Sequence, residues 1–499
     1  MDGIESDNPS LAGLARARLE AALLAPVRAM RREYLPLLMV YFAYGALGLT
    51  AVAESFWIKR DLSWSPADLA SLGVWLTLPW TIKMVFGELV DTVAIAGSQR
   101  RAYVFIGAGL IALSMVLLAA AAGKWITALR VDQLYVIASL LSVTGVVLQD
   151  VVADAMSTEV VPRRSPDGSP RSQADIDHDL GMVQVLGRLA LSFGIFAVAG
   201  VSGWLAQYVS YETVFLCGLA VPVISVSGAL LVRLETSERR PTDWRILGGG
   251  IAFGALVMLL ALSGLPFNQE IVFVVSVGVV IWMLRRVVHE IDGQTRLRIA
   301  FAAAIIFAFR ATPTVGEGYR WFTIDVLGFN ESFYGTLQQM GAAISLLGAW
   351  LLSDFITRRP VSQVLLWLTV VGAVLSLPTI GLSLRVDLWT ERVFGFGAHT
   401  IAIVDSAAAS PLDQLSMIPL LTLVAIYAPS GHRATWFALM ASLLNLALVA
   451  GTLQTKYLNL LFPVARGDYA NLPAITMAAV AIGLVVPLTA ILVFGRRLR

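Results

Sequence analysis

Two aspartates inside an otherwise apolar run have the spacing of a proton-binding pair. Asp150 and Asp154 are four residues apart, so both lie on one face of a helix, with Gln149 beside them. A charged side chain within a membrane helix is costly and usually functional, and two close carboxylates in a low-dielectric site resist ionising together. We expect this pair, with Glu54 of an earlier run, to couple a proton to solute movement. Alternatively, Asp154 and Glu159 cap or gate the end of the helix.

Arg188 lies in the following apolar run, one turn after Gln184, and is a candidate for binding an anion. Arginine can donate two parallel hydrogen bonds to a carboxylate, which suits it better than lysine for this task. Arg188 could equally neutralise Asp150 or Asp154, in an ion pair that is only structural. We expect Gln184 and Arg188 to take part in substrate binding.

A polar stripe interrupts a later apolar run. Its members recur at spacings of four, three and four residues, which predicts a single helical face formed by Arg310, Thr314, Glu317 and Trp321. Pro313 and Gly316 allow this helix to bend or break, and interrupted helices are typical of binding sites in transporters. We expect the stripe to contact substrate; the alternative is that Arg310 and Glu317 bond elsewhere for stability.

Further polar and aromatic residues occupy apolar runs. Asn445 is an additional substrate-binding candidate, and Tyr41, Tyr44 and Trp80 carry rings on which a flat heterocycle could stack. Taken singly, such aromatics are more often packing or interfacial residues.

The sequence lacks the signals of an enzyme or a metalloprotein. The four histidines and the single cysteine, Cys217, show no metal-ligand spacing. No Walker loop, nucleophile elbow or zincin helix is present. We expect no catalytic activity, no metal and no cofactor, and transport driven by an ion gradient.

The elements that must position these residues are membrane helices. Hydrophobic residues make up 57% of the 499 residues and charged residues 14%, and the mean hydropathy is +0.76, which excludes an ordinary soluble globular protein. A bilayer core about 30 Å thick needs roughly 20 apolar residues per helix. About 14 such spans are predicted, at residues 34–58, 66–90, 102–122, 133–160, 181–207, 211–233, 245–264, 271–288, 297–325, 332–353, 361–383, 409–428, 434–461 and 473–495.

Loop charges predict the orientation, because short loops rich in lysine and arginine stay cytoplasmic. Arginine pairs such as Arg163-Arg164 fall in alternate connections, whereas the opposite connections hold only scattered charges such as Lys59 and Arg466. We expect both termini in the cytoplasm, the inner (plasma) membrane of a bacterium as the location, and residues 384–408 as the longest outside segment. The basic clusters are short and lie between apolar runs, so no nucleic-acid partner is expected.

Two similar connections follow the second helix of each half. The first holds Lys83, Gly87, Asp91, Arg100 and Arg101, and its degraded copy holds Asp354 followed by two arginines. We expect these residues to form a gate at the cytoplasmic face, where helix-end contacts and charge hold the hairpin.

The repeat of these connections predicts the fold. Six plus six helices in parallel repeats, moving by alternating access, are typical of the major facilitator fold. We therefore expect an all-α polytopic membrane protein with two six-helix bundles and an inserted two-helix hairpin. The predicted parts are a cytoplasmic tail at 1–33, bundles at 34–233 and 297–499, and a linker at 234–296 that contains the hairpin.

The motifs resemble the folate-biopterin transporter family of the major facilitator superfamily over nearly the whole chain. The motifs that carry the resemblance are Leu78-Pro79-Trp80-Thr81-Ile82-Lys83 with Gly87, Asp91, Gly97 and Arg100-Arg101-Ala102-Tyr103; Asp150-Val151-Val152-Ala153-Asp154 with Glu159; Ala311-Thr312-Pro313; Leu327-Gly328-Phe329; Met417-Ile418-Pro419; Pro429-Ser430-Gly431; and Phe437-Ala438-Leu439-Met440-Ala441-Ser442 with Asn445. Met84, Ala428 and Arg433 depart from the family pattern, as do the charges of the seventh span. Gln149-Asp150 is also similar to muropeptide permeases of the same superfamily, over that helix only.

The resemblance implies a secondary active transporter of a folate-like or pterin-like organic anion. We expect proton or other ion coupling, a lipid bilayer as the surroundings and a monomeric state. Two alternatives remain at this point: a permease of the same fold for another solute, such as a muropeptide or another carboxylate, and a membrane scaffold or sensor that does not transport.

Overall fold

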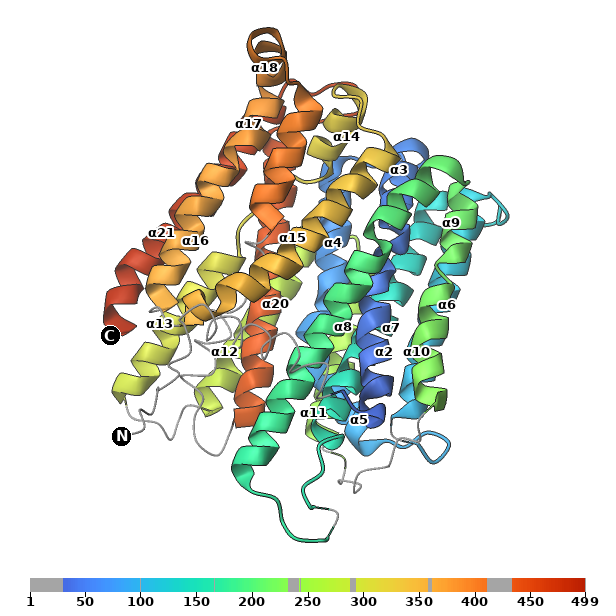
Figure 1. The fold of residues 1–499 in the computed structure, drawn as a ribbon, viewed down its shortest axis with the longest axis vertical. Helices are drawn as coiled ribbons and strands as arrows, with labels where there is room; N and C mark the ends of the chain where they lie inside the picture. The colour runs from blue at the N-terminus through green and yellow to red at the C-terminus, as the bar shows by residue number, and fades with distance from the viewer. Residues whose placement is uncertain are drawn as a thin grey trace, which may run out of the picture.

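The computed structural model describes residues 30–498 except 99, 166, 232–241, 243, 288–292, 358–360 and 411–432, and over these residues it is almost entirely helical (Figure 1). The extended pairings within the described part are three isolated bridges at turns. The predicted tail at residues 1–33 lies almost wholly outside the described residues.

The first group of helices is here called the N-terminal bundle. Its elements are η1 (Arg32–Tyr34), α2 (Leu35–Ala46), η2 (Leu47–Thr50), α3 (Ala51–Asp61), α4 (Pro66–Thr81), α5 (Lys83–Thr92), α6 (Arg101–Ala122), α7 (Val131–Glu159), α8 (Gln173–Tyr208), α9 (Tyr211–Cys217) and α10 (Ala220–Leu231). Local signals set several helix starts. Ser65 and Asp68 form a reciprocal capping box before α4, with hydrogen bonds of 3.2 and 2.8 Å, and Pro66 takes the first helical position.

The second group is here called the C-terminal bundle. Its elements are α13 (Gly293–Arg310), α14 (Glu317–Asp325), α15 (Glu331–Thr357), α16 (Val361–Leu375), α17 (Leu377–Ser383), α18 (Val386–Phe394), a helix at Ala398–Ser410, α20 (Arg433–Leu461), α21 (Leu472–Phe494) and η3 (Gly495–Leu498). Figure 1 shows the blue-to-green N-terminal bundle and the yellow-to-red C-terminal bundle side by side, with their helices roughly aligned.

The described part contains ten helices that are long and apolar enough to cross a membrane, or 11 if one bent pair is counted. These ten coincide with ten predicted spans, which are thereby confirmed as apolar helices. The predicted spans 332–353 and 434–461 lie within α15 and α20. The predicted span 409–428 lies almost wholly outside the described residues.

The predicted span 297–325 is divided into two helices in the structure. The chain leaves the helical conformation after Arg310 and resumes it at Glu317, which separates α13 from α14. Gly316 has φ 80° and ψ −169°, a conformation that side chains with a Cβ rarely adopt. The break suggested by Pro313 and Gly316 is therefore confirmed.

The predicted membrane hairpin between the two bundles is confirmed as α11 (Trp244–Leu262) and α12 (Asn268–Val287). Gln269, which is 2% exposed, donates hydrogen bonds to the Ser71 hydroxyl and carbonyl of α4, at 2.6 and 2.9 Å. Lys456 of α20 pairs with Glu270 at 2.9 Å. The start of α12 is thus bonded to one helix of each bundle.

Two helix pairs form much of the contact between the bundles, α8 with α15 and α4 with α20. Gly203 and Gly335 allow α8 and α15 to approach closely, because a Cβ on Gly203 would lie 2.4 Å from the Gly335 Cα. The backbone N–H of Gly200 also donates to Gln339 at 2.8 Å.

The predicted outside segment 384–408 is largely helical. It contains α18 and most of the helix Ala398–Ser410, which meet at 106° and together are apolar enough to form a broken span or a re-entrant loop. The helix that leads into the predicted span 409–428 therefore begins already at Ala398, because residues 398–404 are mostly apolar and carry no helix breaker.

Candidate functional site

Lys83 joins the two aspartates that the sequence singled out. Its Nζ lies 2.5 Å from Asp150 Oδ2 and 2.5 Å from Asp154 Oδ2. The interruption at Ile82 makes Lys83 the first residue of α5, from which it reaches α7. From the sequence, we grouped Lys83 with the gate residues and expected the two aspartates to repel one another. In the structure a shared ammonium group lies between the two carboxylates and offsets one of their two negative charges.

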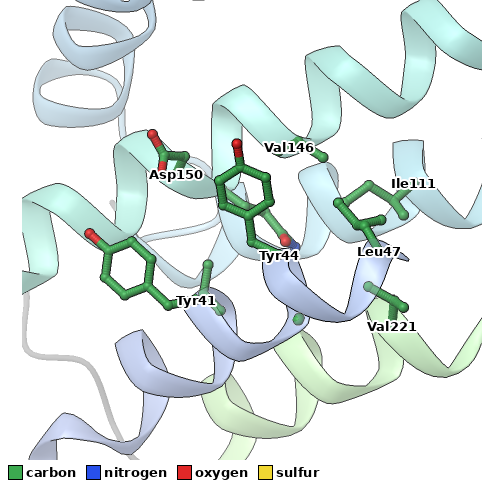
Figure 2. Close-up of a pocket in the computed structure, with 10 residues that line it drawn as sticks. Tyr41, Tyr44, Leu47, Ile111, Val146, Asp150 and Val221 are labelled. Atoms are coloured by element: carbon green, nitrogen blue, oxygen red, sulfur yellow. The ribbon is translucent and has the colours of Figure 1, made fainter. Parts of the chain in front are cut away.

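Tyr41 of α2 completes what we call the Lys83 cluster, which comprises Tyr41, Lys83, Asp150 and Asp154. The Tyr41 hydroxyl donates to Asp154 Oδ1 at 2.7 Å. Beside the cluster lies a small cavity with room for about one water molecule. Figure 2 shows Tyr41 and Tyr44 rising from one helix toward Asp150 on another. Tyr44 stacks on Trp80, with ring centroids 6.0 Å apart.

Arg188 of α8 has no hydrogen bond or ion pair with any residue in the described part of the chain. It lies close enough to Asp150, Tyr41 and Tyr44 to act on them electrostatically. Its side chain is exposed, as is that of Gln184 one turn earlier. Because no described residue bonds to Arg188, its guanidinium is available to an anion from outside the protein.

The two glutamines of this region differ in their surroundings. Gln149 is buried and donates to Val104 O at 3.0 Å and to Ser225 Oγ at 2.9 Å, so it joins α7 to α6 and α10. Gln184 donates to Ser157 Oγ at 2.8 Å. Gln184 therefore keeps only part of its hydrogen-bonding capacity for a ligand.

Polar side chains of α20 hold the non-helical segment between α13 and α14. Gln454 donates to Ala311 O at 2.7 Å, Asn459 donates to Val315 O at 3.3 Å, and the Thr314 N–H donates to Thr455 Oγ1 at 2.9 Å. These bonds replace the helical ones that are missing at the break, as non-helical backbone within a membrane requires.

The break also removes the predicted helical face. Arg310 ends α13, Thr314 lies in the non-helical segment, and Glu317 begins α14, so these residues share no helical surface. Trp321, expected to meet substrate, is 1% exposed, and the guanidinium of Arg466 lies 4.3 Å from its ring centroid. In this conformation Trp321 is a packing residue.

Glu54 lies in a different cluster from Asp150. Tyr135 donates to Glu54 Oε1 at 3.0 Å, and Glu317 and Arg320 of the C-terminal bundle act on Glu54 electrostatically. Arg320 Nε lies 3.8 Å from Glu317 Oε2, and its Nη1 donates to Ser55 Oγ. Glu54 and Glu317 therefore lie close enough at the interface between the bundles to act on each other electrostatically, which residue spacing did not indicate.

Asn445 of α20, a predicted substrate contact, donates to the Trp80 carbonyl of α4 at 3.0 Å. That carbonyl lies in the last turn of α4, where helical partners are missing. Asn445 thus supports the α4–α5 interruption that presents Lys83.

Two predicted gate residues, Asp91 and Arg100, lie near the end of α5 and at the start of α6, beside Glu159 at the end of α7. Arg100 is 4% exposed and lies 2.8 Å from Asp91 and 2.5 Å from Glu159, and it also donates to Val90 O at 3.0 Å. Burial opposes the charge of Arg100, but Glu159 and Asp91 outweigh burial and raise its pKa above the ordinary value. The Asp91–Arg100 contact is thus present, and Glu159 belongs to it.

The other predicted gate residues take no part in this ion-pair group. Arg101 lies over the Phe105 ring at 5.4 Å. A Cβ on Gly87 would meet no atom within 4 Å, so packing does not require glycine there. The side chain of Asp354 lies outside the described part of the structure.

A group that sequence reasoning missed joins the two bundles at the opposite end. Arg466, in the connection before α21, donates to the carbonyls of Lys59 at 2.7 Å, Leu62 at 2.5 Å and Ile58 at 3.3 Å. A cation at the last turn of a helix is favourable because the free carbonyls gather there. We call this group, with Asp325 and Tyr469, the outer lock; Lys59 pairs with Asp325, which also accepts from Tyr469.

The sequence model of the BT1 family matches residues 45–498. The folate-biopterin transporter of Synechocystis sp. (strain ATCC 27184 / PCC 6803 / Kazusa) is 28% identical over 436 residues, which cover 85% of this chain and 75% of that protein. The probable folate-biopterin transporter 4 of Arabidopsis thaliana is 21% identical, with 87% and 89% covered.

Solved structures show the same fold at low sequence identity. A POT family transporter in complex with a thioalcohol-conjugated peptide aligns with a TM-score of 0.64 and 14% identity, covering 95% of this chain and 99% of the other. The nucleoside transporter NupG aligns with a TM-score of 0.61 and 10% identity, covering 93% and 100%. The chain therefore has the major facilitator fold.

Proposed function

This chain belongs to the BT1 family and is a multi-pass membrane transporter. We propose that it transports an organic anion with a planar ring, such as a folate or a pterin, and that a proton gradient drives this transport. The motion is alternating access of the two bundles. Neither the solute nor the coupling ion is fixed by family membership, so both rest on the chemistry of the site.

The observation that carries the proposal is that a cation without a partner among the described residues lies near two carboxylates that share one lysine. Arg188 has no anionic partner in the described part, whereas Asp150 and Asp154 share Lys83. A solute carboxylate can therefore bind Arg188 through two parallel hydrogen bonds. The Tyr44–Trp80 stack beside it provides aromatic surface for a flat ring.

Proton coupling follows from the charge balance of the Lys83 cluster. A proton that binds Asp154 neutralises one of the two carboxylates that hold Lys83, and it also changes the acceptor of the Tyr41 hydroxyl. Lys83 then pairs with Asp150 alone. Because Lys83 begins α5, the same change acts on the α4–α5 interruption and on the contact of α4 with α20.

The conformation is closed at the end predicted to face outside. The outer lock and the Arg320–Ser55 contact join the bundles there. The Arg100 group uses residues of the N-terminal bundle alone. We infer that a solute reaches Arg188 from the predicted cytoplasmic side in this state, and that the Asp91–Arg100–Glu159 group stabilises the cytoplasmic ends as the gate opens and closes.

The same proposal includes the surroundings of the protein. We place it as a monomer in the inner membrane of a bacterium, with both termini in the cytoplasm, as the loop charges indicate. The bundle limits at 34–233 and 297–499, with a linker at 234–296, remain predictions from the sequence.

The test is uptake into proteoliposomes of tritiated folic acid and tritiated biopterin, with and without an imposed pH gradient. Asp150→Asn should abolish uptake driven by pH. Arg188→Gln should weaken solute binding about 10- to 100-fold, since a hydrogen bond to a charged group contributes about 1.5–3 kcal/mol. Arg130→Gln is the control, because Arg130 pairs with Asp132 two residues later, away from the site.

Three outcomes would contradict parts of the proposal. Uptake by the wild type that is equal with and without the gradient excludes proton coupling. Transport of muropeptides or small carboxylates in place of folic acid and biopterin assigns a different solute to the same fold. If Arg188→Gln binds the solute with unchanged affinity, Arg188 is not the anion-binding residue.

A further inference from the structure

Asp405 is a carboxylate within the C-terminal bundle that the proposed mechanism does not use. The sequence prediction placed it in the outside segment 384–408, but the structure places it in the helix Ala398–Ser410. It lies seven residues after Ala398, which is about 10 Å along the helix axis. Its side chain is half-buried.

The partners of Asp405 are neutral. The Thr379 hydroxyl of α17 donates to Asp405 Oδ2 at 3.2 Å, and Tyr319 of α14 lies beside both residues. Within the described residues, Asp405 has no cation in hydrogen-bond or ion-pair contact. This differs from Asp150 and Asp154, which share Lys83.

Among the described residues, the helices around Asp405 bring no cation into hydrogen-bond or ion-pair contact with it. No charged residue occurs in α16, α17 or α21. In α15 the charged side chain that the structure describes is Glu331, which accepts from Tyr211 of the N-terminal bundle. In α14, Glu317 and Arg320 face each other, and Asp325 belongs to the outer lock. Tyr319 is therefore the titratable described residue that faces Asp405.

A carboxylate in apolar surroundings without a counter-charge is costly. Such a site suits a carboxyl group that gives up its charge by taking a proton. The local hydroxyls can serve both forms, because Thr379 donates to the carboxylate and can accept from the acid.

The position of Tyr319 links Asp405 to the interface between the bundles. At 100° per residue, Tyr319 lies about 200° around α14 from Glu317 and about 100° from Arg320. Arg320 donates to Ser55 of the N-terminal bundle. One short helix therefore has the Asp405 site on one side and an inter-bundle contact on another.

We propose that Asp405 carries a second proton of the transport cycle and that Tyr319 transmits its protonation to α14. A hydronium ion transfers a proton to the carboxylate: one O–H bond of the hydronium breaks, the O–H bond of the neutral acid forms, and water is released. On release the carboxylate returns and again accepts from Thr379. This inference rests on the proposed proton coupling and concerns the number of protons and the residue that carries one of them.

The experiment measures the limiting accumulation of tritiated folic acid and of tritiated biopterin in proteoliposomes at a pH difference of one unit. Each coupled proton is then worth about a tenfold accumulation, because one pH unit is 1.36 kcal/mol. Asp405→Asn should lower the limiting ratio about tenfold and leave counterflow exchange intact. Asp387→Asn is the matched control, since Asp387 lies in the same bundle but pairs with Arg385 at 3.2 Å; its ratio should stay unchanged.

The results separate this inference from the proposed function. If the wild type shows no accumulation above equilibrium, proton coupling itself fails. If the wild type accumulates and Asp405→Asn reaches the same ratio, the role of Asp405 is refuted alone. Loss of counterflow in a folded, monodisperse Asp405→Asn protein also refutes it, since Asp405 then serves the exchange step.

Two further measurements test the inference if Asp405→Asn does not fold or if neither solute is transported. Thr379→Val keeps the carboxyl group but removes its donor, so it should shift the pH of half-maximal accumulation; an unchanged pH contradicts the inference. The melting temperature of purified protein at pH 5 and pH 8 needs no solute. Asp405→Asn should change the difference in melting temperature between pH 5 and pH 8 relative to the wild type, whereas Asp387→Asn should not. If this difference is the same in Asp405→Asn and in the wild type, the inference is overturned.

Discussion

Replacing Arg466 with glutamine should weaken the closure of the two bundles at the outer lock. The Arg466 guanidinium donates to three carbonyls at the end of α3, in the N-terminal bundle, and lies over Trp321 of its own C-terminal bundle. Only the hydrogen bonds cross between the bundles, and a hydrogen bond to a charged group contributes about 1.5–3 kcal/mol. Arg466 is exposed, so solvent reduces these values, and we estimate a total loss of about 2 kcal/mol. That loss raises the ratio of open to closed molecules about 30-fold.

The assay is a distance measurement by pulsed electron paramagnetic resonance. Spin labels would replace Tyr208 at the end of α8 and Leu384 after α17, which are 69% and 52% exposed, in a Cys217→Ser background. Arg466→Gln should add a population with a longer distance. Arg130→Gln should not, because Arg130 pairs with Asp132 in its own bundle. Identical distance distributions for Arg466→Gln and the parent protein would refute the assignment of the outer lock.

Three further predictions follow from the ion pairs and from the helix interface. Lys83→Met leaves Asp150 and Asp154 without their shared cation, so pH-driven uptake should be lost while the protein still inserts and purifies; retained uptake at wild-type pH dependence contradicts the role of the Lys83 cluster. Arg100→Gln breaks a buried ion-pair group and should cost about 3–5 kcal/mol of stability, which would be seen as a lower melting temperature. The neighbouring variant Arg101→Gln should change the melting temperature little. If both variants lower the melting temperature equally, the ion pairs are not the cause. Gly335→Ala puts a Cβ 2.7 Å from the Gly203 Cα, so it should force α8 and α15 apart and slow counterflow exchange, whereas Gly278→Ala, where a Cβ meets nothing within 4 Å, should not; wild-type exchange in Gly335→Ala shows that the contact need not be this close.

The ion pairs of the site show where prediction from the sequence reaches its limit. Asp150 and Asp154 could be singled out because a charge in an apolar run is a local anomaly, and their four-residue spacing fixes a common face. Lys83 is 67 and 71 residues away from them, so its pairing depends on how α5 packs against α7. The same holds for Arg466, which lies 404 to 408 residues away from its carbonyl partners.

The seventh span shows the other limit. Residue spacing alone favoured one continuous face from Arg310 to Trp321, because a period of 3.6 residues assumes an unbroken helix. Pro313 and Gly316 indicated that the helix could break, but the length of the break depends on Gln454, Thr455 and Asn459 of α20, which bond the freed backbone. A local signal identified the weak point, and its partners came from another helix.

The amino-acid sequence by itself determined the membrane class, most of the spans, the repeat and the family resemblance. These properties follow from the local cost of burying polar groups in lipid, which each segment meets by itself. Only the tertiary structure decided that Lys83 is shared by the two aspartates, that Arg188 is left without an anionic partner among the described residues, that Asp405 lies inside a helix and that Arg466 holds two bundles together. Those outcomes depend on side chains from distant segments competing for the same charges and carbonyls, and that competition is settled only when the helices pack.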